Sequence, residues 1–192
     1  MTDLLVLDLV EKHLVTDQMV LTIGYDIDNL TDPKRRNAYH GEVTIDRYGR
    51  SVPKHALVTI NLKNQTSSTK QIMDAVMELY DRIVDPNLLI RRIYVVACRL
   101  SDESSAKQEE TFEQLDLFTD YAALEQKKQA EKVKKEKERK LQEAVLSVNM
   151  KYGKNAMLKG MNLQEGATSV ERNRQIGGHK ACKGKIYFRN KT

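Results

Sequence analysis

Residues 55–100 decide the fold: HALVTINLKNQTSSTKQIMDAVMELYDRIVDPNLLIRRIYVVACRL. The first part, His55–Lys63, alternates apolar and polar residues and predicts a strand. Ser68 is one of several candidate N-caps for a helix, whose apolar residues then recur at helical spacing until Pro86 ends it. The last part, Ile90–Leu100, is apolar enough to predict a strand in the centre of a sheet. The stretch therefore predicts a strand, a helix and a second strand.

Further elements precede this stretch. Apolar residues at nearly helical spacing predict a helix over Thr2–Asp17. Met19–Ile27 alternates and is rich in β-branched residues, which favours a strand. A polar stretch with turn residues follows, and Val43–Ile45 predicts a short strand inside it. The compact part therefore follows the order α-β-β-α-β over residues 1–100, an α+β fold with two helices on one face of a sheet.

The rest of the chain is strongly charged. Residues 101–121 form an acidic linker, 122–150 a charged helix, and 151–192 a basic and mostly irregular tail. Residues 1–122 hold 14 basic and 20 acidic residues, whereas 144–192 hold 10 basic and 2 acidic ones. A basic rear behind an acidic front indicates either a polyanion-binding tail or a solvated extension.

Length and composition limit the class of protein. The 192 residues suffice for one domain of ordinary size plus an appendage. No apolar run approaches the ~20 residues that span a bilayer, and no signal peptide opens the chain, so we expect a soluble cytoplasmic protein. Cys98 and Cys182 are far apart in sequence and predict neither a disulfide framework nor a metal-binding knuckle.

The pentapeptide QLDLF stands out because it places apolar side chains in a polar stretch. It consists of Gln114, Leu115, Asp116, Leu117 and Phe118. Segments with two or three apolar anchors and one amide commonly dock into a pocket on a partner protein. The Gln114 amide can form hydrogen bonds on two sides, while Leu117 and Phe118 can fill an apolar cleft. The alternative is that the apolar side chains of Phe112, Leu115, Leu117 and Phe118 attach the linker to the domain.

A second candidate site is a basic loop between the first two long strands. Tyrosines and histidines are interleaved with its six cations, which are Lys34, Arg35, Arg36, Arg47, Arg50 and Lys54. Such cations can track nucleic-acid phosphates while the tyrosines lie against sugar or base. Without a base-reading motif, these contacts would position the backbone rather than specify a sequence. The alternative is a solvated hairpin, because nearby carboxylates weaken the field of the cations.

No arrangement of residues predicts an active site. Asp26 and Asp28 follow a strand and are candidate ligands of a divalent ion, but no third carboxylate joins them. Ser101-Asp102-Glu103 resembles the acidic metal-binding triplet of nucleotidyl transferases, but it falls in the expected linker, which cannot hold two metals rigidly. The sequence has no Gly-rich phosphate loop, nucleophile elbow or histidine cluster. We therefore expect no catalytic residue, metal or cofactor in this chain.

Four longer stretches carry a family resemblance: YDIDNLTDPKRRNAYHGEVTIDRYGRSVPKHALVTINL (25–62), TSSTKQIMDAVMELYDRIVDPNLLIRRI (66–93), EQLDLFTD (113–120) and MKYGKNAMLKGMNLQEGATSVERNRQIGGHKA (150–181). Together they resemble the C-terminal region of bacterial Y-family, UmuC-like translesion DNA polymerases. In that family a little finger domain of pattern β-α-β-β-α-β follows the catalytic palm, fingers and thumb domains, and grips template-primer DNA by its backbone. QLDLF is similar to the sliding-clamp-binding motif of bacterial replication and repair proteins.

The resemblance implies a non-catalytic C-terminal fragment of a polymerase of SOS-type DNA repair. The six basic residues would hold DNA, and Gln114–Phe118 would bind the sliding clamp. The parent enzyme would use Mg, but the catalytic carboxylates of the palm have no counterpart here. The first strand of the family pattern is also missing, so we expect Ile90–Leu100 to lack a neighbour and the chain to self-associate, exchange strands or rearrange its pairing. Residues 182–192 lie outside the resemblance.

Two other functions remain open from the residues alone. One is a stand-alone clamp-binding adaptor, in which the folded part has no role on DNA. The other is an RNA-binding module, which suits an α+β sheet with a basic loop, although the expected strands lack the paired exposed aromatic residues that such modules use for stacking.

Overall fold

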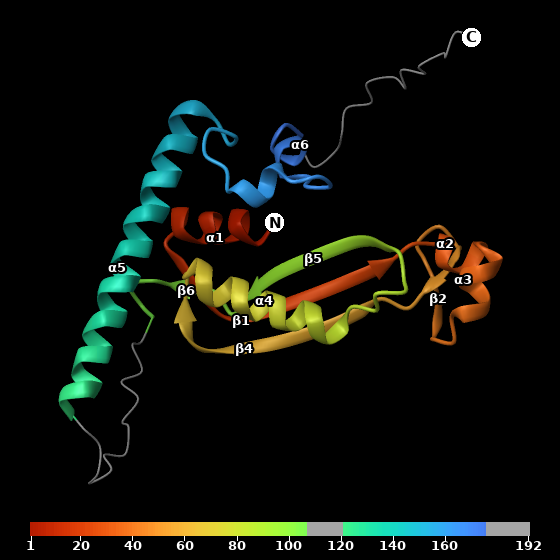
Figure 1. The fold of residues 1–192 in the computed structure, drawn as a ribbon, viewed down its shortest axis with the longest axis horizontal. Helices are drawn as coiled ribbons and strands as arrows, with labels where there is room; N and C mark the ends of the chain where they lie inside the picture. Colours follow the sequence, from red (N-terminus) through yellow and green to blue (C-terminus); the bar gives the residue numbers. More distant parts are fainter. Residues whose placement is uncertain (107–120, 176–192) are drawn as a thin grey trace. The chain divides into compact units, whose positions relative to one another are not determined.

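Three long antiparallel strands form the sheet of this protein. The computed structural model describes residues 1–106 and 121–175. Strand β1 (Leu14–Tyr25) lies between β4 (Ala56–Thr66) and β5 (Ile90–Cys98), as Figure 1 shows. Together with the helices this sheet makes an α+β fold, which confirms the predicted class.

Helices α1 (Thr2–Glu11) and α4 (Thr69–Ile83) cover one face of the sheet. Residues on this face of β1, such as Leu21, are almost fully buried, and the register places Leu21 beside Val58 of β4 and Val95 of β5. The helices contribute the other half of the core, which includes Val6, Leu9, Val10, Ile72, Val76 and Leu79. The predicted apolar spacing of α4 is confirmed, and so is its N-cap, because the Ser68 hydroxyl accepts a hydrogen bond from the Gln71 amide.

The opposite face of the sheet, called here the open face, carries the alternate residues of each strand. Thr22 of β1 lies between Leu57 of β4 and Tyr94 of β5. Leu57 is 59% exposed and Tyr94 is 51% exposed. Because neighbouring residues of a strand point to opposite faces, burying Leu21 under the helices leaves this row of side chains on the open face.

The boundary between the first helix and the first strand differs from the prediction. Helix α1 ends at Glu11, and β1 begins at Leu14 instead of Met19. His13 has a φ of 53°, a left-handed conformation that ends the helix. Leu14 then pairs with Asp102 in the short strand β6 (Ser101–Asp102). This pairing joins residues far apart in sequence, so the helical spacing of the apolar residues could not indicate it.

Strand β5 also departs from the expectation. Within the described residues β5 lies at the edge of the sheet instead of its centre. The expectation that it would lack a neighbour is wrong, because it pairs with β1 from Gln18 opposite Cys98 to Tyr25 opposite Ile90. Of the three expected consequences of the missing strand, this register corresponds to rearranged pairing.

The polar stretch between β1 and β4 contains a small hairpin. Strand β2 (Val43–Ile45), which the sequence predicts, pairs with β3 (Ser51–Pro53). Their turn contains Gly49 at a φ of 75°, a conformation that glycine adopts without strain. The name "hairpin" refers below to residues 43–53.

Two short helices, α2 (Asp28–Thr31) and α3 (Pro33–Ala38), occupy a stretch whose Pro and Gly residues predict turns. The side chain of Asp32 accepts a hydrogen bond from the Lys34 amide at 2.9 Å and caps α3. An aspartate followed by proline at the first helical position favours this start of a helix.

Helix α5 (Tyr121–Tyr152) is the predicted charged helix with slightly wider bounds. Its Glu138 carboxylate accepts hydrogen bonds from the Ser68 hydroxyl at 2.8 Å and from the Lys70 amide at 3.1 Å. The buried amide of Gln142 donates to the Ser67 carbonyl and the Thr69 hydroxyl. Glu138 and Gln142 therefore attach the middle of α5 to the first turn of α4.

The chain divides into two units, and the second begins at Ala144. The described part of this second unit contains the 3-10 helix η1 (Gly160–Leu163) and the short helix α6 (Ser169–Asn173). The side-chain amide of Asn173 donates to the Asn155 side chain at 2.7 Å. The predicted tail thus includes two short helices that its weak periodicity did not indicate.

Candidate nucleic-acid interface

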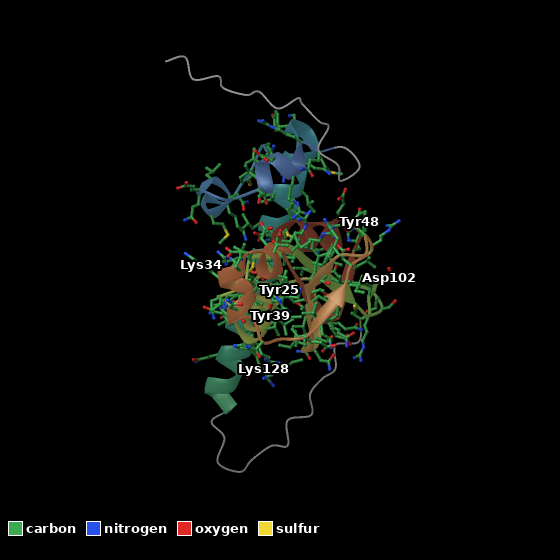
Figure 2. All side chains as sticks on the ribbon, turned by 90° about the vertical axis from the view of Figure 1, so that its right-hand side faces the viewer. Tyr25, Lys34, Tyr39, Tyr48, Asp102 and Lys128 are labelled. Atoms are coloured by element: carbon green, nitrogen blue, oxygen red, sulfur yellow. The ribbon has the colours of Figure 1, made fainter. Side chains whose placement is uncertain are left out.

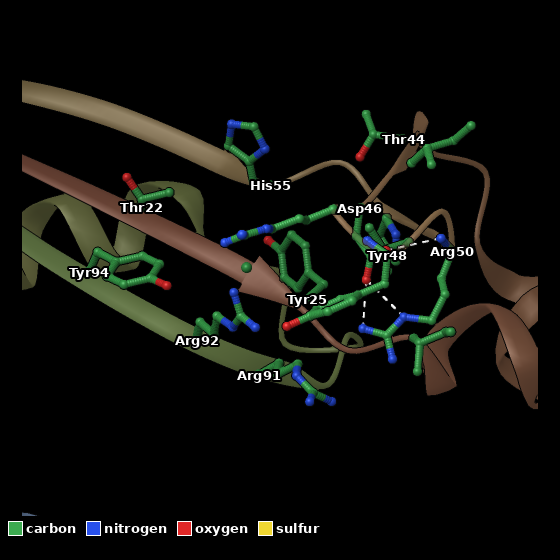
Figure 3. A pocket seen from close by; sticks show the side chains of 16 residues that line it. Thr22, Tyr25, Thr44, Asp46, Tyr48, Arg50, His55, Arg91, Arg92 and Tyr94 are labelled. Carbon is green, nitrogen blue, oxygen red and sulfur yellow. Dashed lines mark hydrogen bonds and ion pairs between the residues drawn. The ribbon is translucent and has the colours of Figure 1, made fainter. Parts of the chain in front are cut away.

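A groove of about 460 Å³ lies between the open face of the sheet and the hairpin. The sheet supplies Thr22 and Gly24 from β1 and Arg91, Arg92 and Tyr94 from β5. Figure 3 shows Tyr94, Arg92 and Tyr25 along the strands, with Tyr48, Asp46 and Arg50 of the hairpin on the other side. His55, directly before β4, also lines the groove. Four arginines, from two elements distant in sequence, therefore surround one cavity: Arg47, Arg50, Arg91 and Arg92.

The pairing of β1 with β5 places the sheet residues of the groove. Arg92 lies opposite Gly24, and Tyr94 lies opposite Thr22. These positions alternate with Ile93 and Val95, which face the helices beside Ile23 and Leu21. Arg92 and Tyr94 therefore lie side by side on the open face.

In the hairpin, Asp46 fixes the position of Arg50. Its carboxylate accepts hydrogen bonds from the guanidinium at 2.6 and 2.9 Å and from the Arg50 and Tyr48 amides. The hydrogen bonds from Arg50 lower the pKa of Asp46 to about 2, and the same contact raises the pKa of Arg50. The guanidinium also lies 5.1 Å from the centre of the Tyr48 ring, within cation–π range.

A second carboxylate, Asp26, holds Arg91 where β1 ends. The guanidinium of Arg91 lies 3.2 Å from the Asp26 carboxylate. The pKa of Asp26 is lowered, first by a hydrogen bond from the Asp28 amide and then by Arg91. The buried side chain of Asn29 ties this corner together through hydrogen bonds to the carbonyls of Asp26 and Leu89 and to the Leu89 amide.

The remaining cations give the groove its charge. Neither Arg47 nor Arg92 forms an ion pair in residues 1–106 and 121–175. Asp46 is the one acidic residue among the described residues that line the groove. A cavity with excess cations and partly low-dielectric walls concentrates a positive field, so its natural ligands are anions.

The structure separates the six predicted DNA-binding residues into two groups. Arg47 and Arg50 line the groove, whereas Lys34, Arg35, Arg36 and Lys54 do not. Lys34, Arg35 and Arg36 lie on α3, and Figure 2 shows Lys34 well apart from Tyr48. Among the residues outside the groove, Lys54 pairs with Glu42 at 2.6 Å and Arg35 lies 3.8 Å from Asp32.

Sequence reasoning missed Arg91, Arg92 and Tyr94. A signal was present, because strict alternation in IRRIYVV places Arg92 and Tyr94 on one face and Ile93 and Val95 on the other. The expectation of a central strand buried on both faces hid this signal. That these residues meet Arg47 and Arg50 depends on tertiary contacts, which no local pattern records.

The predicted clamp-binding residues 114–118 lie outside the described residues, as do residues 176–192. Two of the carboxylates considered as metal ligands form ion pairs with arginines. Asp26 pairs with Arg91, and Glu103 lies 2.8 Å from Arg139. Across residues 1–106 and 121–175 no three histidine, cysteine or carboxylate side chains gather in a way that could hold a metal ion. In the same residues no helix has the length and apolar character needed to cross a membrane.

Comparison with known proteins adds no assignment. A scan against protein-family models, a search of curated proteins and a search of solved structures each found no match to this chain.

Proposed function

We propose that this chain is the C-terminal part of a translesion DNA polymerase, in which residues 1–106 hold template-primer DNA by its phosphate backbone. The observation that carries the proposal is the groove, where Arg47 and Arg50 lie around the same cavity as Arg91 and Arg92. Arginines bind phosphate oxygens through two parallel hydrogen bonds, and clustered cations gain further affinity by releasing counterions from DNA.

The order of elements supports the little finger assignment within this proposal. Helix α1, strands β1 and β4, helix α4 and strand β5 follow one another in the α-β-β-α-β order of that domain after its first strand. The hairpin, α2 and α3 are then an insertion between two strands that carries half of the groove arginines. Contacts of this kind position the protein on DNA without reading bases.

The second part of the proposed function is attachment to a sliding clamp through Gln114–Phe118. Its support is the sequence alone, namely two apolar anchors and one amide in an otherwise polar segment. A clamp that encircles DNA would hold the polymerase near the primer terminus and raise its local concentration there. The DNA-holding domain could then bind weakly, which suits an enzyme that must accept distorted templates.

The DNA contact is tested by salt-titrated binding of the full chain to primer-template DNA. Log affinity falls with log salt, and each phosphate contact makes this fall steeper by about 0.9. Arg47→Gln with Arg92→Gln should therefore reduce the magnitude of the slope by about two. Arg82→Gln is the matched control, since this arginine pairs with Glu78 on α4, which covers the other face of the sheet. An unchanged slope in the double variant would refute the groove as the DNA contact.

A second variant asks whether the helix α3 cluster contributes instead. Replacing Lys34, Arg35 and Arg36 together with glutamine should leave most of the slope, because these residues do not line the groove. If this triple variant loses the slope while the groove variant keeps it, the backbone contact lies on α3.

The clamp contact is tested by binding of the full chain to a purified bacterial sliding clamp. Leu117→Ala with Phe118→Ala should abolish binding, because both anchors of the peptide are removed. The control is Leu141→Ala, which truncates a leucine that is 64% exposed on α5. Equal affinity of the double variant and the unchanged chain would remove the tether from the proposal.

A further inference from the structure

We propose that the groove binds an unpaired stretch of DNA, with a base stacked on Tyr94 and the adjoining phosphates held by Arg92 and Arg47. This rests on the proposed function, which brings DNA to this end of the sheet, and it names the part of the DNA that enters the groove. A polymerase substrate contains such a stretch where the single-stranded template meets the duplex.

The first observation is the exposure of aromatic rings beside the arginines. Tyr94 is 51% exposed and Tyr48 is 72% exposed, and both line the groove. Exposed aromatic rings next to cations are the pattern of single-strand binding sites, because rings stack on bases while cations follow the phosphates. Inside a duplex both faces of each base are covered by its neighbours, so a ring can stack there only on a base that has left the helix.

The second observation is the space next to Tyr94. The neighbouring open-face position on β1 is Gly24, opposite Arg92. A Cβ built on Gly24 would lie 3.5 Å from the Arg92 Cβ, an ordinary contact, so glycine leaves room here without being required by the backbone. The groove of about 460 Å³ is within the range of sites that enclose a small ligand, roughly 300–1,000 Å³. A nucleotide fits such a space, whereas a duplex can only lie across its mouth.

The third observation concerns hydrogen-bonding groups without partners. Thr22 and His55 line the groove, and within the described part of the chain their side chains make no hydrogen bond. A hydroxyl and an imidazole can each donate or accept, so they can meet the edge of any base. The site is therefore suited to unpaired DNA of any sequence.

The test compares binding of the full chain to a short oligothymidylate and to a blunt duplex of the same length. Loss of one stacked base weakens binding by about 5- to 150-fold, so Tyr94→Leu should weaken binding of the single strand by that factor and leave the duplex nearly unchanged. Tyr94→Phe should keep the affinity, because the ring remains. Tyr152→Leu is the matched control, since this tyrosine is 68% exposed and lies 5.2 Å from the Lys151 ammonium.

Tyrosine fluorescence provides a second readout, because the chain contains no Trp. A base stacked on Tyr94 should quench part of the tyrosine emission. Tyr94→Phe should reduce the quenching while the affinity stays the same, a combination that a purely structural role of this residue would not produce.

Filling the groove gives an independent variant. Gly24→Leu places a side chain beside Arg92 and should weaken binding of the single strand to a similar extent, with the circular dichroism spectrum unchanged. If Tyr94→Leu and Gly24→Leu both leave single-strand affinity intact, the proposal is overturned. It is also overturned if oligouridylate binds with dependence on Tyr94 and oligothymidylate does not, because the ligand would then be RNA.

The outcomes separate this inference from the proposed function. If the arginine variants lower the salt slope on duplex DNA while Tyr94→Leu changes nothing, the backbone contact remains and single-strand stacking fails. If Tyr94→Leu weakens the single strand but the arginine variants do not affect the duplex, stacking remains and the proposed duplex contact fails.

Discussion

Asn29→Ala should destabilise the corner of the fold that supports the groove. The Asn29 side chain is fully buried and donates to the Asp26 and Leu89 carbonyls, each at 2.9 Å. Its oxygen accepts a hydrogen bond from the Leu89 amide at 2.8 Å. Alanine removes all three bonds and leaves the Leu89 amide without this partner, at a residue that is 39% exposed.

The expected loss of stability follows from these contacts. A hydrogen bond contributes about 1 kcal/mol net, so the loss of these three bonds should make Asn29→Ala cost about 3 kcal/mol. Domains of this size have a free energy of unfolding of about 5–15 kcal/mol, so the variant should remain folded but be clearly weakened. Binding of DNA should weaken as well, because Arg91 is held by Asp26 in the same corner.

The assay is urea unfolding of the full chain together with hydrogen exchange of the Leu89 amide. Asn64→Ala is the matched control, because Asn64 is exposed at the end of β4. The Leu89 amide should lose protection in Asn29→Ala and keep it in Asn64→Ala. If the two variants have the same free energy of unfolding and the same Leu89 protection, the reasoning from buried hydrogen bonds is refuted.

Three further outcomes are expected. The Asp46 carboxyl should titrate with a midpoint near pH 2. Its contribution to the stability of the hairpin is therefore complete above about pH 4 and is lost as the pH falls through 2. A midpoint near pH 4, measured by NMR, would contradict the contact with Arg50. Gln142→Ala should expose the middle of α5 to hydrogen exchange, because this buried side chain makes two hydrogen bonds to the start of α4. Gln129→Ala, on the exposed part of α5, should not. Equal exchange in both variants would contradict the attachment of α5 to α4 through Gln142. Thr16→Val should cost about 1–3 kcal/mol in urea unfolding, because the buried hydroxyl donates to the Cys98 carbonyl of β5 and accepts from the Gln18 amide at the β1 bulge. A neutral result would show that these bonds add nothing net.

The elements that the sequence predicts well are those specified by local signals. Helix α4 has a serine cap, an apolar stripe at helical spacing and a proline three residues after Ile83. Strand β4 alternates along its length, and β2 was expected at its observed bounds, Val43–Ile45. In each case neighbouring residues contain the information, so the pattern is sufficient.

The features that the sequence does not predict depend on contacts between distant residues. Leu14 fits the period of the preceding helix, yet it pairs with Asp102 in β6. The same holds for the candidate site, where pairing of β5 with β1 places Arg92 beside Gly24, and the hairpin then brings Arg50 to the same cavity. A cluster of cations along the sequence indicated phosphate binding, but only the tertiary fold separates Arg47 from Lys34.

Asp46→Asn should strengthen binding of DNA to the groove. Arg50 is bound to Asp46 in the free protein, and exposed ion pairs add little net stability, so a phosphate can replace the carboxylate at small cost. Asparagine removes the competing charge and leaves the Arg50 guanidinium available, so the affinity and the salt slope should both increase, the slope by up to about 0.9. Asp32→Asn is the matched control, because asparagine is an equally good N-cap for α3 and the nearby Arg35 lies outside the groove. An equal increase in both variants would mean that the net charge of the chain, and not competition for Arg50 within the groove, determines the affinity for DNA.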